Sequence, residues 1–290
     1  LFAIGADKPD LETVARRFDV LYNAASNAGR RLLLDVLLYA LGWDVGGVNV
    51  AAVLLGKPRL TQRGALEGAY KRVEGFVSRL NGVEKAYAVA RLYSRLAVNY
   101  ASFGKFGKAM KLVEEEILKA LEELEKLQSA YEENKESTEE RLRPHLELRW
   151  VKPDLGIELN NLSQHVYRNV AFVYMAVDEL DKAVEYAERA CDLAKKLGDV
   201  YNEVASCSLP PRLKAVRGGV PPAEEFEEVW QRASQYVERL GAEAIAATLG
   251  EYVVALASVG RLGDVEKVLE EWGWALELVP KASALTYGVL

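Results

Sequence analysis

One helical-hairpin pattern occurs twice in this chain, and it limits the possible folds more than any other feature. The two copies cover residues 92–117 and 166–191. With Tyr93 set against Tyr167, the copies coincide at aromatic and small positions, including Tyr100/Tyr174, Ala97/Ala171 and Ala109/Ala183. A hairpin of this kind cannot bury its apolar face alone, so the pattern predicts stacked neighbouring hairpins and an extended surface.

Helical periodicity continues through the rest of the chain. Apolar residues recur at every third or fourth position, whereas the two-residue alternation typical of strands is not sustained anywhere. Residues 107–134 form the longest such run and predict a helix of about 42 Å at about 1.5 Å per residue. A third, weaker copy of the hairpin surrounds Gly260. The predicted fold class is therefore all-α, built from stacked antiparallel helical hairpins.

One irregular segment divides the helical pattern into two arrays. Residues 143–156 contain Pro144, Trp150 and Pro153, and proline interrupts helices. We therefore predict an N-terminal helical array over residues 1–142, with one copy of the hairpin. A C-terminal array over residues 157–290 contains one clear and one weaker copy. Residues 143–156 are the predicted junction between them.

The repeated pattern resembles tetratricopeptide repeats, a family of stacked helical hairpins. The first copy matches that pattern at Tyr93, Leu96, Ala97, Tyr100, Gly104, Phe106 and Ala109, and the second at Tyr167, Val170, Ala171, Tyr174, Leu180, Ala183 and Ala190. Asp178 replaces the turn glycine, Glu116 replaces a small residue, and the proline that closes many repeats is missing. The resemblance implies a right-handed, TPR-like α-solenoid that binds protein on its concave surface.

The charge and hydropathy of the chain argue against some classes of partner. Its 290 residues carry a net charge of −6, which gives no support to general nucleic-acid binding, because that needs an excess of Lys and Arg facing phosphates. The most apolar stretch, residues 32–55, contains Asp35, Asp44 and the pair Gly46-Gly47, which are unfavourable inside a membrane. We therefore expect a soluble, cytoplasmic protein without membrane attachment. Few Cys, Met and Gln beside many charged residues fit a thermophilic source.

The chain shows no recognisable metal, nucleotide or catalytic motif. Cys191 and Cys207 lie sixteen residues apart, without the paired spacing of zinc ligands, and two cysteines do not make a disulfide framework. Cys191 occupies a position where the hairpin needs a small buried residue, so we predict a core thiol there. Neither His145 nor His165 belongs to a ligand cluster, and no phosphate-binding loop or serine-nucleophile motif occurs. We predict no cofactor, no metal and no catalytic residue.

Six side chains are the candidates for a peptide-binding groove. In the family that the pattern resembles, the first helix of each hairpin lines the concave surface. Between its packing positions this chain carries Arg91, Arg95, His165, Arg168, Asn169 and Phe172. Arg91 and Arg95 are four residues apart, so both guanidinium groups can point the same way and form paired hydrogen bonds with carboxylates. This favours an acidic peptide or a terminal carboxylate. The competing interpretation is that these arginines pair with carboxylates of the chain itself.

The leading functional prediction is a non-enzymatic scaffold or adaptor that binds a peptide or protein segment. Two other classes stay open. One is a sensor or regulatory module of a larger signalling ATPase or transcription regulator, with which a start at Leu1 instead of Met is compatible. The other is an enzyme on a helical-array fold, whose pocket would be assembled from distant residues. The sequence predicts neither the identity of the partner nor the oligomeric state.

Overall fold

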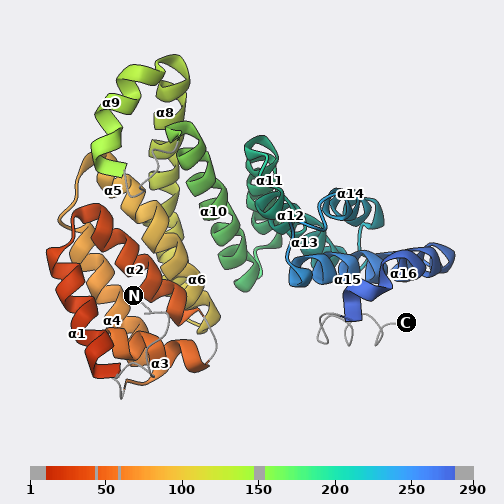
Figure 1. Ribbon diagram of the computed structural model, residues 1–290, viewed down its shortest axis with the longest axis horizontal. Helices are drawn as coiled ribbons and strands as arrows, with labels where there is room; N and C mark the ends of the chain where they lie inside the picture. The colour runs from red at the N-terminus through yellow and green to blue at the C-terminus, as the bar shows by residue number, and fades with distance from the viewer. Residues whose placement is uncertain (1–10, 43–44, 58–59, 147–153, 278–290) are drawn as a thin grey trace. The chain divides into compact units, whose positions relative to one another are not determined.

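Every secondary-structure element that the structure describes is a helix (Figure 1). The computed structural model describes residues 11–42, 45–57, 60–146 and 154–277, and no strand occurs among them. The predicted all-α class is therefore confirmed. The chain divides into two compact units, Leu1–Val177 and Asp178–Leu290.

The first unit is a bundle of packed helices. They are α1 (Leu11–Ala24), α2 (Asn27–Leu41), α3 (Val45–Leu54), α4 (Gln62–Val77), α5 (Gly82–Ala88), η1 (Val89–Tyr93), α6 (Ser94–Ser102), α7 (Phe106–Leu112), η2 (Val113–Ile117), α8 (Leu118–Glu133), α9 (Lys135–Leu146) and α10 (Leu155–Ala176). The two η segments are π-helical turns. Ser26 and Thr61 begin α2 and α4 as caps, because each side-chain oxygen accepts a hydrogen bond from a free backbone N–H of the first turn.

The first predicted hairpin is present as two packed helical runs. α7 packs against α6 and η2 against η1, which is the pairing of an antiparallel hairpin. The chain turns at Gly104, whose φ of 69° is a left-handed conformation that favours glycine because it has no Cβ. Ala97 and Ala109 are fully buried, as predicted.

The predicted long helix over residues 107–134 is one helical run with an internal change of winding. α7, η2 and α8 follow one another without a break as far as Glu133. The π-helical turn η2 inserts one extra residue into the helix. The apolar face still points inward on both sides of this turn, since Ala109 before it and Leu124 after it are fully buried.

The two helices of the second predicted hairpin belong to different units. α10 is the last helix of the first unit, and α11 (Leu180–Leu197) is the first helix of the second. The turn between them is left-handed at Asp178 (φ 65°), the position that matches Gly104. Ala171 and Ala183 are both buried, as predicted. The left-handed turn and the burial of the matched alanines are thus common to both copies, while the handedness of the array and its tetratricopeptide-like arrangement stay predictions.

The division into units comes later in the chain than the predicted junction over residues 143–156. α9 continues to Leu146, and Asp154 caps the start of α10 by accepting hydrogen bonds from two backbone N–H groups. Residues 147–153 lie outside the described residues. α10 packs against α6 and α8, so the helix that follows the irregular segment belongs to the first unit.

The second unit contains a separate apolar core. Its helices are α11, α12 (Val200–Cys207), α13 (Leu209–Gly218), α14 (Ala223–Ser234), α15 (Ala242–Ser258) and α16 (Leu262–Glu277). Trp230 packs edge-on against Trp272 in this core, with 5.5 Å between ring centroids. α15 and α16 pack together and turn at Gly260 (φ 77°), where the third, weaker hairpin was predicted.

Cys191 and Cys207 form a disulfide between α11 and α12. The prediction of a core thiol at Cys191 is therefore wrong, although the predicted burial is correct. The spacing along the sequence does not reveal the bridge, because the packing of two separate helices brings the two Cα atoms to 4.6 Å. A single bridge needs only two cysteines, even where they cannot build a disulfide framework.

The most apolar stretch of the sequence folds as parts of two helices. Residues 32–55 contribute to α2 and α3. Within the described ranges, no helix combines the length and the apolar character needed to cross a membrane.

Candidate binding site

One carboxylate on α2 binds two of the predicted arginines. Asp35 Oδ2 accepts hydrogen bonds from Nε (3.1 Å) and Nη2 (2.9 Å) of Arg91, and Asp35 Oδ1 lies 2.8 Å from Arg95 Nε. Asp35 is buried, whereas 34% of the Arg91 side chain and 33% of the Arg95 side chain stay exposed. Pairing within the chain, the competing interpretation, therefore applies to both arginines. The carboxylate also fixes their orientation at a surface that solvent reaches.

Polar contacts hold α6 between α2 and α10. Asn99 Nδ2 donates a hydrogen bond to the Leu38 carbonyl oxygen (3.0 Å), and Asn169 Nδ2 donates to Ser94 Oγ (3.2 Å). Asn99 and Ser94 are buried, where an unpaired polar group would be costly, so these bonds specify how the three helices align. Arg91 itself lies in the π-helical turn η1, which packs against both α2 and α10. Such turns frequently occur at functional sites.

His165 on α10 lies within electrostatic reach of all three predicted arginines. The pKa of His165 is lowered to about 4, chiefly by burial. The charges of Arg168, Arg91 and Arg95 act in the same direction, whereas the charge of Asp35 opposes them. His165 is consequently neutral at pH 7. Arg91, Arg95, Arg168, Asp35 and His165, here called the arginine cluster, thus combine three guanidinium groups with one carboxylate.

A buried polar layer adjoins the arginine cluster. The Arg31 guanidinium lies 4.1 Å from the centroid of the Tyr87 ring, and Tyr87 OH donates a hydrogen bond to Glu158 (2.7 Å). Burial lowers the pKa of Arg31 and raises the pKa of Tyr87. These residues come from α2, α5 and α10, so the layer ties the helices that present the cluster to one another.

The structure brings four of the six predicted candidates together in the arginine cluster, and the fifth, Asn169, donates a hydrogen bond to Ser94 on α6. Phe172, the sixth, is half-buried on α10 one turn after Arg168. Sequence reasoning missed Asp35 and Tyr39, whose ring centroid lies 5.4 Å from the Arg95 guanidinium. One feature of the sequence could have predicted the role of Asp35. It is an acidic residue in an apolar helix, and a buried carboxylate requires a cationic partner.

An exposed apolar row lies beside the arginine cluster. Leu32, Val36 and Tyr39 are 50%, 37% and 52% exposed, and their spacing of four and three residues places them on one face of α2. We call them the α2 stripe. The stripe and the cluster are contiguous, because Tyr39 contacts Arg95. Contiguous exposed apolar surface next to charged groups is typical of a protein-binding site.

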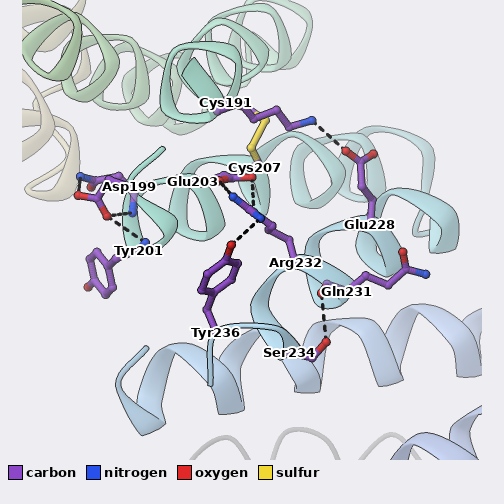
Figure 2. A network of polar contacts seen from close by, with 12 residues as sticks. Cys191, Asp199, Tyr201, Glu203, Cys207, Glu228, Gln231, Arg232, Ser234 and Tyr236 are labelled. Atoms are coloured by element: carbon purple, nitrogen blue, oxygen red, sulfur yellow. Dashed lines mark hydrogen bonds and ion pairs between the residues drawn. A yellow bond between two sulfur atoms is a disulfide. The ribbon is translucent and has the colours of Figure 1, made fainter. Parts of the chain in front are cut away.

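A second polar network lies in the other unit (Figure 2). Arg232 on α14 donates to both carboxylate oxygens of Glu203 on α12, at 3.0 and 3.1 Å, and to Tyr236 OH at 3.2 Å. Lys195 and Glu228 form a further ion pair at 2.9 Å. A pocket of about 300 Å³ is bordered by the two ion pairs, Arg232 with Glu203 and Lys195 with Glu228. The charges in this network pair with one another, so it is a weaker candidate than the arginine cluster for binding a charged partner.

No family model matches the chain, and no curated protein resembles it significantly. Across the described residues, no three side chains among His, Cys, Asp and Glu gather in a way that could hold a metal ion.

Proposed function

We propose that the chain is a non-enzymatic scaffold or adaptor whose first unit binds an acidic segment of a partner protein. The arginine cluster carries this proposal, because Arg91 and Arg95 share one carboxylate and the charges of all three arginines act on a neutral His165. Arginine recognises carboxylates through paired, charge-assisted hydrogen bonds. The fixed orientation of Arg91 and Arg95 reduces the side-chain entropy that is lost when a partner binds.

The surroundings of the cluster define the partner more closely. Arg91 and Arg95 are about one helical turn apart, which matches carboxylates four residues apart on a partner helix, spaced about 6 Å. The α2 stripe offers apolar surface along the same edge. The segment that fits best therefore carries glutamates or aspartates on one face and apolar side chains next to them, as in helix-in-groove recognition.

The test uses a fluorescently labelled helical peptide that carries glutamate at every fourth position and leucine beside it. Fluorescence anisotropy would measure its affinity for the full chain at two salt concentrations. We expect weaker binding at higher salt, because exposed charges are screened over about 8–10 Å. Arg168→Glu should weaken binding roughly five- to twentyfold, since it replaces an attraction by a repulsion.

Two controls separate the cluster from general charge effects. Lys119→Glu makes the same change of charge at an exposed position of α8, a helix that carries none of the cluster residues, and should leave the affinity unchanged. A peptide with glutamine in place of glutamate should bind weakly to every variant. Equal affinities of Arg168→Glu, Lys119→Glu and the parent chain would place the binding surface elsewhere.

A further inference from the structure

One end of the disulfide forms part of a pocket wall. The pocket of about 300 Å³ is lined by Cys207, Val204 and Glu203 from α12, and by Gln231 and Arg232 from α14. Cys191, the other half of the bridge, does not line it. Figure 2 shows the same asymmetry, with Glu203 and Arg232 beside Cys207 and with Cys191 on the far side of the bridge. Both cysteines are buried, and Cys207 is the half of the bridge that a molecule in the pocket meets.

The chemistry of the pocket wall points to the sulfur atoms as its reactive groups. Glu203 and Arg232 bind each other through two hydrogen bonds, and Lys195 pairs with Glu228. All four charged side chains of the wall are thus paired with one another. The volume corresponds to roughly ten water molecules at about 30 Å³ each, which is enough for a small thiol compound.

We infer that Cys207 is a site of thiol–disulfide exchange with low-molecular-weight thiols. The thiolate of the small molecule attacks Cys207 Sγ from the pocket, and a new S–S bond forms between them. The bond between Cys207 Sγ and Cys191 Sγ breaks at the same time, and its electron pair leaves with Cys191 as a thiolate that then takes up a proton. No net oxidant is needed, since the protein disulfide is exchanged for a mixed disulfide.

The geometry makes this exchange selective and reversible. Attack through the pocket leads to modification of Cys207, while Cys191 becomes the free thiol. α11 and α12 also pack against each other through side chains other than the bridge, so Cys191 stays close and can expel the small thiol again. The bridge therefore joins or releases α11 and α12 according to the surrounding thiol concentration.

The experiment treats the folded, oxidised chain with cysteamine, then blocks free thiols with iodoacetamide and digests the chain with trypsin. Cleavage after Lys195 and Lys196 separates the cysteines, with Cys191 in residues 190–195 and Cys207 in residues 197–212. Mass spectrometry should find the cysteamine adduct on residues 197–212 and the iodoacetamide adduct on residues 190–195. The reverse distribution would overturn the inference, as would exchange only after unfolding or the absence of a cross-linked peptide before treatment.

A pair of variants tests whether the thiol enters through the pocket. Gln231→Trp places a large ring at the exposed pocket edge, and we expect about tenfold slower exchange, because exchange rates depend on access to the sulfur. Glu266→Trp makes a similar change at an exposed position of α16 and should leave the rate unchanged. Equal rates in both variants, with unchanged melting curves, would show that the thiol reaches the bridge by another route.

Discussion

At the scale of single residues, burial and the charges of the neighbouring arginines keep His165 neutral. Its pKa is lowered from 6.5 to about 4, so the unfolded chain binds more protons than the folded chain between these two values. Stability that depends on neutral His165 is therefore fully present above pH 6.5 and is lost as the pH falls towards 4. His165→Gln cannot titrate, so its unfolding free energy should fall less between pH 7 and pH 4.5. Denaturant titrations at both pH values measure this difference, and parallel curves for the two proteins would contradict it.

Asp35 has opposite effects on folding and on the proposed binding. Asp35→Asn removes the carboxylate that two arginines share, and we expect a loss of about 1–3 kcal/mol in unfolding free energy, as for hydrogen bonds to charged groups. The same change raises the positive charge of the cluster, so the acidic peptide should bind more tightly. Asp19→Asn, at a half-exposed ion pair with Arg72, is the matched control and should change stability by less than about 1 kcal/mol. An unchanged affinity for the acidic peptide in a folded Asp35→Asn variant would count against the proposed site.

At the scale of helices, the small residues of the repeat are the positions most sensitive to size. Ala183 is fully buried on α11, within the second unit. Ala183→Phe should overpack the site and lower the unfolding free energy by about 1–3 kcal/mol. Ala247→Phe, on the exposed side of α15, adds the same ring where there is room and should have little effect. An unchanged melting temperature for Ala183→Phe would show that the site is roomier than the repeat alignment predicts.

The sequence predicted local features of the helices better than their long-range partners. The left-handed turns at Gly104 and Gly260, and the burial of the matched alanines, follow from offsets within one hairpin. The contact of Asp35 with Arg91 spans 56 residues, and the bridge from Cys191 to Cys207 depends on how two helices pack. Periodicity within a helix contains no information on which neighbour a side chain meets. The spacing of the arginines along the helix could therefore place them on one face. It could not identify Asp35, the carboxylate that binds them, because Asp35 lies on another helix.

At the scale of the whole molecule, each unit should unfold as a separate cooperative block, because each has its own core. Calorimetry should show two transitions. Reduction of the disulfide should shift only the transition of the second unit, by a loss of about 3 kcal/mol for a loop of this length. Asp35→Asn should shift only the other transition. A single transition that responds equally to both changes would contradict independent unfolding.

The arginine cluster also makes the distribution of charge in the molecule uneven. The chain as a whole carries a net charge of −6, yet the cluster is locally positive, so the remaining surface is more acidic than the total suggests. If the proposed function is correct, we expect an acidic partner to be repelled from most of this surface, and to be attracted and oriented towards the cluster before contact. We therefore expect the cluster to raise the association rate and to orient the partner more than it raises the affinity of the final complex.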